Sequence, residues 1–342
     1  MKSIDWRELY ASNRAVIERA HGAPGGVGVP EKPGVWDERT LTVPGQTRRA
    51  VVHPPAGVGP QTAVPLVCML HGCTQDAASF AAATRMNEEA DRHGFLVLYP
   101  EQQRSDNPQG CWNWFRPQHQ ARGAGEPASI AAIVRELMGA PSPWTIDSRR
   151  VFVAGLSAGG AMAAIMATVY PDLFAAVAVH SGLAYRSATT MGGAFTAMAS
   201  AGGDPIGQGR AAHAAMGDHA RAIPSMVVHG TADARVAPAN ADRVLEQFMT
   251  ANRLAAPATC DLEIARPTTT LRGRADGGHA YTRCQWTDHR GVLMHELLKV
   301  DGLGHAWSGG AQGGSYTDPR GPDATAAIWR FFAQASAGQT EG

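Results

Sequence analysis

Residues 150–169, RVFVAGLSAGGAMAAIMATV, decide the fold of this chain. They begin with the apolar run 151–153, which is typical of a strand buried on both faces. Apolar side chains then recur at helical spacing through residues 162–169, as on one face of an amphipathic helix. Between them, residues 155–159 match G-x-S-x-G, and glycines permit the strained backbone of a sharp turn. The stretch therefore predicts a strand, a tight turn with Ser157 at its tip, and a helix.

Strand-like and helix-like segments alternate on both sides of this stretch. A hairpin is expected within residues 37–53, where Pro44-Gly45 separates the runs 41–43 and 49–52. The expected buried strands are 65–70, 95–99, 151–153, 175–179, 226–229 and 292–300. Helical faces fall between them, and the last of these covers residues 324–331. This alternation predicts the α/β class, with a mostly parallel central sheet and helices on both faces.

Three regions are expected along the chain of 342 residues. Residues 1–34 are expected to form an N-terminal helical extension and a Gly/Pro-rich connector. Residues 35–335 carry the alternating segments without a linker, which predicts one large domain. Residues 336–342 are expected to be a flexible tail. No internal repeat is visible.

Composition excludes several classes of partner. Lys and Arg total 30 and Asp and Glu total 30, so the net charge is zero and neither nucleic acid nor a membrane surface is implied. No apolar run approaches the length of a membrane-spanning helix. The first twenty residues lack a signal peptide's hydrophobic region. The expected location is therefore cytoplasmic if Met1 is the native start, and extracellular if a signal has been removed.

Ser157, Asp233 and His305 each follow a predicted strand, and active groups gather at such ends in parallel α/β sheets. A serine hydroxyl is a poor nucleophile at neutral pH, so a neutral imidazole must accept its proton. A carboxylate must then orient the imidazole and stabilise its cation. The sequence thus predicts a catalytic triad in the order Ser, Asp, His.

Other acids and histidines compete for these roles. The rival carboxylates are Asp204, Asp218 and Asp242. Asp233 is preferred because it comes just past a strand, in the sequence His-Gly-Thr-Ala-Asp. Three further histidines at strand ends, His71, His180 and His229, are expected to be structural because none lies late enough in the chain.

A serine nucleophile of this kind also needs two backbone N–H groups aimed at the developing negative charge, which form an oxyanion hole. The residue after the nucleophile, Ala158, should supply one. The loop after the first buried strand should supply the other, with Cys73 as the expected donor. Gln75 could add its side-chain amide. The alternative is that residues 71–73 form an ordinary turn.

Several short segments together resemble the polyhydroxybutyrate depolymerase family of esterases. They are LHGCTQ (70–75), YPEQ (99–102), CWNWF (111–115), GLSAGGAMA (155–163), HGTAD (229–233), GHAWSGG (304–310) and SYTDPRGPDA (315–324). The resemblance covers about residues 37–334. It implies an α/β-hydrolase fold, the triad above and a backbone donor at Cys73.

The function expected from this resemblance is hydrolysis of ester bonds in poly- or oligo-(3-hydroxyalkanoate) polyesters and short-acyl esters through an acyl-enzyme. Relatives include feruloyl and acetylxylan esterases, so such an esterase is the alternative. A catalytically inactive hydrolase-fold binding protein is an alternative of another class. No metal or other cofactor and no obligate protein partner are expected, and the partner is an ester substrate.

Three tryptophans lie in the segments most specific to the family. Flat aromatic surface near the serine would suit a weakly polar ester chain, so Trp112, Trp114 and Trp307 are the expected substrate-binding residues. Core packing is the alternative for each. Trp307 is the most specific prediction, because it lies two residues after His305.

The five cysteines have no C-x-x-C spacing, which argues against zinc. Cys68 lies in an apolar run and is expected to be a buried free thiol. The other four form two sequence-local pairs. We predict disulfides between Cys73 and Cys111 and between Cys260 and Cys284, which would favour an oxidising compartment.

Overall fold

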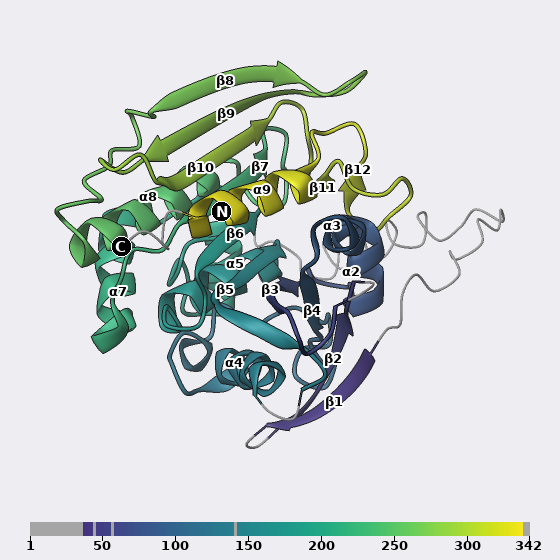
Figure 1. Cartoon of the computed structure of the whole chain (residues 1–342). Helices are drawn as coiled ribbons and strands as arrows, with labels where there is room; N and C mark the ends of the chain where they lie inside the picture. Colours follow the sequence, from purple (N-terminus) through teal and green to yellow (C-terminus); the bar gives the residue numbers. More distant parts are fainter. Residues whose placement is uncertain (1–36, 44–45, 56–57, 140–141, 338–342) are drawn as a thin grey trace. The chain divides into compact units, whose positions relative to one another are not determined.

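A mixed sheet of ten strands forms the centre of the structure, in the order β1-β2-β4-β3-β5-β6-β7-β10-β9-β8 (Figure 1). The strands are β1 (Asp37–Val43), β2 (Gln46–His53), β3 (Ala63–Leu70), β4 (Leu96–Pro100), β5 (Thr145–Leu156), β6 (Ala176–His180), β7 (Ser225–Gly230), β8 (Thr269–Arg274), β9 (Ala280–Thr287) and β10 (Leu293–Val300). The six neighbours from β4 to β10 run parallel, whereas β1 and β2 at one side and β9 and β8 at the other are antiparallel. The predicted mostly parallel sheet is confirmed.

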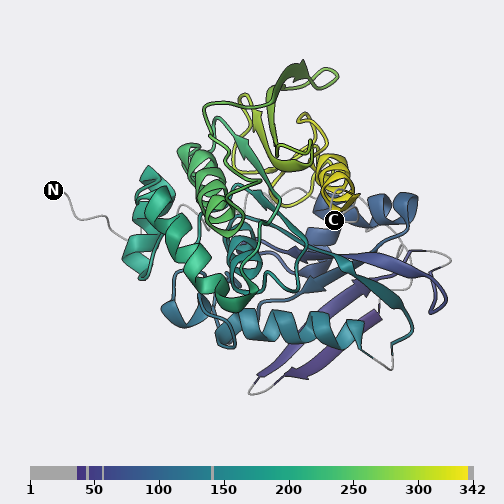
Figure 2. The ribbon, with the colours of Figure 1, turned by 60° about the vertical axis from the view of Figure 1, so that its left-hand side comes forward.

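Helices cover both faces of this sheet, as predicted. The helices are α2 (Ala77–Thr84), α3 (Met86–His93), α4 (Gly125–Met138), α5 (Ala158–Val169), α6 (Met191–Ser200), α7 (Pro205–Met216), α8 (Ala239–Ala255) and α9 (Ala324–Ala337). Side chains of α4, α5, α7 and α8 join one hydrophobic core, and those of α2, α3 and α9 join a second core on the opposite face. Figure 2 shows α8 in green on one side of the strands and α9 in yellow on the other.

The computed structural model describes residues 37–43, 46–55, 58–139 and 142–337, with side chains from Arg48 onward. All of these described residues belong to one compact unit. The expected extension over residues 1–34 lies outside the described residues, as do residues 338–342 of the expected tail. The helix α9 continues to Ala337, beyond the expected end of the domain.

The central strands are buried on both faces because their sequences are almost uniformly apolar. Every residue of β4, β6 and β7 is buried, and β3 is buried from its second residue on. Burial also covers the last six residues of β5, which is longer than the predicted run 151–153. Parallel strands ending side by side define one edge of the sheet, the carboxyl edge, and Ser157 lies there at the end of β5.

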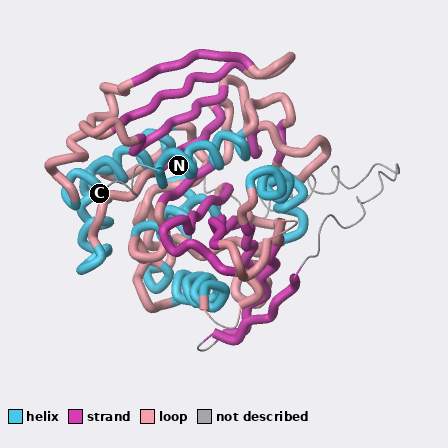
Figure 3. The backbone as a smooth tube through the Cα atoms, in the orientation of Figure 1, coloured by secondary structure: helices cyan, strands magenta, loops and turns pink. Residues whose placement is uncertain are grey.

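Two parts of the fold were not predicted. The strands β8 and β9 extend the sheet beyond β10, and they lie with it among the magenta strands at the top of Figure 3. Nearly every residue of β8 is exposed, so the apolar alternation that marks a strand is missing. The weakly periodic region 188–216 contains the helices α6 and α7, and α6 buries only Ala194 and Ala197.

Candidate active site

Ser157 occupies a strained turn between β5 and α5. Its backbone has φ 58° and ψ −119°, a conformation that few residues other than glycine adopt. The flanking glycines make the turn possible. A Cβ on Gly155 would lie 2.4 Å from backbone atoms of Gly159, and a Cβ on Gly159 would lie 2.0 Å from the carbonyl oxygen of Leu70. The N–H of Ser157 donates to the carbonyl oxygen of His180 at 2.9 Å, which fixes the turn on β6.

His305 and Asp233 are brought together although 72 residues separate them in the sequence. The Nδ1 of His305 lies 2.8 Å from Oδ2 of Asp233. The other carboxylate oxygen of Asp233 accepts the backbone N–H groups of Arg235 and Val236, each at 2.9 Å. Burial opposes ionisation, but hydrogen bonds from His229 and His305 outweigh it and hold the pKa of Asp233 far below its ordinary value. The ionised carboxylate therefore accepts from Nδ1–H and leaves Nε2 of His305 as the basic nitrogen.

The loop after β3 lies against the serine. A Cβ placed on Gly72 would be 3.6 Å from the Cβ of Ser157. The carbonyl oxygen of Gly72 accepts from His71 Nδ1 at 2.8 Å and from the N–H of Gln75 at 3.3 Å. The N–H of Cys73 belongs to the same peptide group as this carbonyl. In a planar trans peptide it points in the direction opposite to the carbonyl oxygen, away from His71 and Gln75.

Two backbone donors remain uncommitted beside Ser157. Within the described residues, the N–H of Cys73 donates to no protein group. Ala158 is the first residue of α5, so its N–H has no acceptor in the preceding turn of the helix. These are the two donors that the sequence predicted.

The side chain of Gln75 supports this loop. It is 5% exposed, its Oε1 accepts the N–H of Gly72 at 2.9 Å, and its Nε2 donates to the carbonyl oxygen of Ser315 at 3.0 Å. Each end of the amide therefore has a partner within the protein, although Nε2 carries a second N–H. The prediction that Gln75 adds a donor for substrate stays a prediction.

A disulfide joins Cys73 to Cys111, as predicted, and ties the donor loop to the Trp-rich segment. The tryptophans of that segment are buried. Trp112 is fully buried and its Nε1 donates to the carbonyl oxygen of His71 at 3.1 Å, and Trp114 is 5% exposed and packs edge-on against Phe115. This burial contradicts the prediction that Trp112 and Trp114 contact substrate.

Trp307 is also a core residue and not a substrate contact. Its ring is fully buried between the ring of His180, stacked at 4.9 Å, and the ring of Phe80, edge-on at 5.7 Å. Its Nε1 donates to Oγ1 of Thr325 at 3.0 Å. The backbone after His305 turns inward, because β11 (Trp307–Ser308) pairs with β12 (Thr317–Asp318). The prediction for Trp307 is therefore wrong.

Two further residues lie at the site: Tyr316, which was not predicted, and His229, which was expected to be structural. Tyr316 lies with its ring edge-on to His305, 6.2 Å between centroids, and its hydroxyl is 3.5 Å from Oγ1 of Thr74. His229 has Nε2 2.9 Å from the carbonyl oxygen of Val236 and 3.4 Å from Oδ2 of Asp233. Both lie in segments quoted for the family resemblance, which was the available signal.

The remaining cysteines are free thiols in the structure. Cys68 is buried in β3, as predicted. The predicted pairing of Cys260 with Cys284 is wrong. Cys260 is buried after α8 with its sulfur beside Oγ1 of Thr259, and Cys284 lies in β9 with its sulfur beside Oγ1 of Thr270.

The described part of the chain contains no group of three or more acidic, histidine or cysteine side chains able to hold a metal ion. None of the described helices combines the length and apolar content needed to cross a bilayer.

Residues 49–265 match the family model described as Esterase PHB depolymerase, which is more than half of the chain. The chain belongs to this esterase family. Poly(3-hydroxyalkanoate) depolymerase C of Paucimonas lemoignei is 42% identical over 199 residues, which are 57% of this chain and 46% of the relative. Feruloyl esterase B of Neurospora crassa is 36% identical over 121 residues, 35% of this chain and 39% of the relative.

A solved structure supports the fold. The acetyl xylan esterase from Aspergillus awamori superposes with a TM-score of 0.67 at 21% identity, covering 88% of this chain and all of that one. The α/β-hydrolase fold predicted for this family member is thereby confirmed. The chain spans less than two thirds of the length of the curated relatives named above.

Proposed function

We propose that this chain is a serine esterase in which Ser157, His305 and Asp233 form the catalytic triad. The main support is the hydrogen-bonded pair of His305 and Asp233 at the edge of the sheet that also carries the strained turn of Ser157. The uncommitted N–H groups of Cys73 and Ala158 beside the serine support the same proposal. A binding protein without catalysis would need neither the oriented imidazole nor the free donors.

The proposed reaction has two halves. The Oγ of Ser157 attacks the ester carbonyl carbon while Nε2 of His305 accepts its proton, and Asp233 stabilises the imidazolium. The oxyanion accepts hydrogen bonds from Cys73 and Ala158. As the ester bond breaks, His305 returns the proton to the departing alcohol and leaves an acyl-enzyme. A water molecule then attacks the acyl-enzyme with His305 as base, which releases the acid and restores Ser157.

The proposed substrates are polyesters or oligoesters of 3-hydroxyalkanoates. The 42% identity to a depolymerase of poly(3-hydroxyalkanoate) supports this class. Exposed apolar side chains lie on α6, where Met191 is 56% and Phe195 is 40% exposed. The carboxyl end of α6 is attached to the loop after Asp233, since the N–H of Ala237 donates to the carbonyl oxygen of Met198 at 2.7 Å. An apolar surface attached to that loop suits a weakly polar chain better than a sugar polymer.

The alternative is an esterase of feruloyl or acetyl groups, supported by the 36% identity to feruloyl esterase B over a shorter segment. A substrate panel separates the two. Purified protein is assayed on 3-hydroxybutyrate oligomers, methyl ferulate, acetylated xylan and p-nitrophenyl butyrate. We expect the highest kcat/KM, by at least about tenfold, on the oligomers among the natural esters. A preference for methyl ferulate or acetylated xylan would favour the alternative, and no hydrolysis of any ester would refute the esterase proposal.

The compartment follows from the disulfide. A bridge between Cys73 and Cys111 is expected to persist only in an oxidising environment, so we propose that the enzyme works outside the cytoplasm. This location suits a polymeric substrate that cannot enter a cell. Its test is the thiol count of protein isolated from its native compartment under non-reducing conditions.

A further inference from the structure

His180 contacts the backbone on both sides of the reacting pair. It is the last residue of β6 and is fully buried. Its carbonyl oxygen accepts the N–H of Ser157 at 2.9 Å. Its ring reaches a different segment, because Nε2 lies 3.1 Å from the backbone nitrogen of Ser308, three residues after His305. One residue therefore connects the turn of the serine to the loop of the histidine base.

The contacts of the His180 ring determine which of its nitrogens carries the proton. The N–H of Ser308 can only donate, so Nε2 of His180 must be the unprotonated, accepting nitrogen. The proton is then on Nδ1, which lies 3.2 Å from Oγ of Ser181. Burial, with a contribution from the neighbouring histidines 229 and 305, lowers the pKa of His180 to about 3. The ring is thus neutral at pH 7 and does not compete with His305 for a proton.

Packing holds the same ring in place. The imidazole stacks on Trp307 with an angle of 22° between the planes. Trp307 is itself fixed by Phe80 and by its hydrogen bond to Thr325. The loop that carries His305 is therefore attached to β6 by one polar contact and one stacked ring.

We propose that His180 is a positioning residue that holds the loop of His305 in register with the turn of Ser157. The proposal rests on the esterase function proposed above. Proton transfer requires Oγ of Ser157 and Nε2 of His305 to approach to about 3 Å. A displacement of about 1 Å in such a pair can reduce the rate about a hundredfold. The accepting nitrogen of His180, more than its bulk, sets this distance.

Two substitutions separate the accepting nitrogen from the packing. His180→Phe keeps a ring against Trp307 but removes the acceptor, whereas His180→Gln removes the ring but offers Oε1 to the N–H of Ser308. We expect His180→Phe to lower kcat for p-nitrophenyl butyrate about a hundredfold with little change in KM. His180→Gln should stay within about tenfold of the wild-type kcat. Both variants should lower the melting temperature, because His180→Gln loses buried packing and His180→Phe leaves the buried N–H of Ser308 without an acceptor.

His295 provides the matched control. It is another fully buried histidine with both ring nitrogens in polar contact. Its Nδ1 lies 2.8 Å from Oγ of Ser225 and its Nε2 lies 3.3 Å from Nδ2 of Asn252. It lies near the start of β10, at the end of the strands opposite the carboxyl edge. His295→Gln should reduce the melting temperature without changing kcat. The proposal is overturned if His180→Phe is as active as His180→Gln or more active.

A second measurement keeps this inference separate from the esterase proposal. Hydrogen exchange of the peptide covering residues 303–310 does not depend on catalysis. Exchange there should be faster in His180→Phe than in His180→Gln, because only the phenyl variant leaves the N–H of Ser308 without an acceptor. Equal exchange in the two variants would overturn the positioning role even if the wild type proved to be an esterase. Failure of the wild type to hydrolyse any ester would instead refute the esterase function.

Discussion

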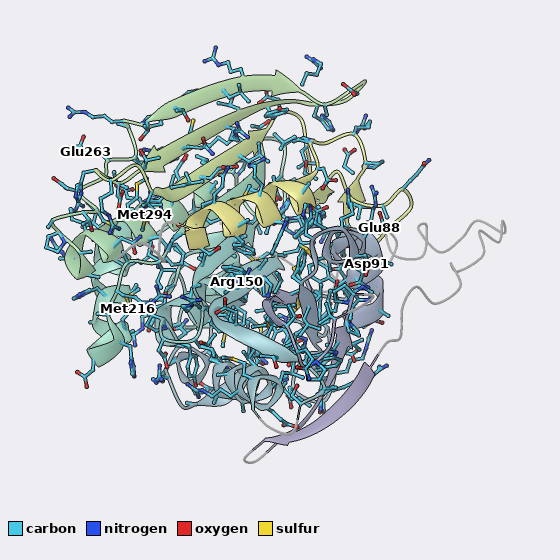
Figure 4. The ribbon with its side chains drawn as sticks, in the orientation of Figure 1. Glu88, Asp91, Arg150, Met216, Glu263 and Met294 are labelled. Carbon is cyan, nitrogen blue, oxygen red and sulfur yellow. A yellow bond between two sulfur atoms is a disulfide. The ribbon has the colours of Figure 1, made fainter. Side chains whose placement is uncertain are left out.

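The parallel strands begin at one edge of the sheet, the amino edge, and end at the other, the carboxyl edge. The two edges differ in how many of their polar groups lack a hydrogen-bond partner within the protein. At the amino edge, a cavity of about 680 Å³ is lined by residues that include Asp147, Arg150 and Arg221. Its charges are already paired: the Nε of Arg150, which is labelled in Figure 4, donates to Asp147 at 2.8 Å. Arg221 donates to the carbonyl oxygens of Pro171 and Phe174. The cavity is large enough for a small ligand, but the polar groups of Asp147, Arg150 and Arg221 already form hydrogen bonds within the protein.

The carboxyl edge has the reverse arrangement. Its loops are tied by the disulfide of Cys73, by the ring of His180 and by the amide of Gln75. Within the described residues, the N–H of Cys73 has no protein acceptor. Preorganised donors with no internal partner are what a developing oxyanion needs. Hydrogen-bond donors without a protein acceptor, and not the volume of a cavity, therefore identify the candidate site.

The largest expected effect contrasts two serines, one in the turn after β5 and one near the start of that strand. Ser157→Ala should lower kcat for p-nitrophenyl butyrate by at least about a thousandfold, because the attacking oxygen is lost. Ser148, near the start of β5, lines the cavity at the amino edge. Ser148→Ala is the control and should leave kcat and the melting temperature unchanged. More than about a tenth of wild-type activity in Ser157→Ala would contradict the triad.

The second effect concerns the disulfide of the carboxyl edge. Replacing Cys73 and Cys111 together by serine should lower kcat about tenfold or more, because it frees the donor loop, and loss of one such donor costs about 10² to 10³. It should also destabilise the protein by about 2–4 kcal/mol. Cys284→Ser removes a free thiol and should do neither. Thiol titration of the denatured, non-reduced wild type should find Cys68, Cys260 and Cys284 free. A count of one free thiol instead of three would support the predicted disulfide between Cys260 and Cys284.

The parts of the fold that could be predicted share a simple cause. The strands β3, β4, β6 and β7 and the second half of β5 are mostly apolar and buried, and this leaves a continuous signal in the sequence. Such a signal is missing where an element buries few side chains. For this reason the exposed strand β8 and the helix α6 were not predicted. The nucleophile turn was predictable because the spacing of its glycines is a local steric requirement.

The candidate site was predictable in its reacting groups and not in its surroundings. Ser157, Asp233 and His305 follow strands, and strand ends meet by topology alone. The direction of a tryptophan ring depends on tertiary contacts. Trp307 turns inward because its N–H donates to the carbonyl oxygen of Tyr316 at 2.7 Å. The pairing of Cys260 with Cys284 failed for a similar reason, since proximity in the sequence says little about the separation of two sulfurs in space.

A third effect is acid sensitivity of folding. Burial lowers the pKa of His71 to about 4 and the pKa values of His180 and His295 to about 3. Below the ordinary value of about 6.5, the unfolded chain binds protons at these histidines while the folded chain does not. The free energy of unfolding should therefore fall from pH 6.5 to 5, by up to about 1.4 kcal/mol per pH unit for each histidine.

Urea unfolding at several pH values measures this slope. His295→Gln removes one of the three histidines and should make the slope shallower by about one third. An unchanged slope in this variant would show that other groups bind the protons. The ion pairs of the amino edge should not contribute in this range, because arginines and ionised aspartates keep their charge there.

The smallest effect is expected at the amino edge itself. Arg149 has a side chain that is 72% exposed and lies 3.5 Å from Asp147. Exposed pairs of this kind contribute about 0–1 kcal/mol, since water screens them and ordering the long side chain costs entropy. Arg149→Ala should thus shift the urea midpoint only slightly and leave kcat/KM within about twofold of wild type. If the cavity instead bound substrate, loss of one of its arginines would raise KM while the free energy of unfolding stayed constant. A tenfold rise in KM on hydroxybutyrate oligomers would therefore contradict the assignment of function to the carboxyl edge alone.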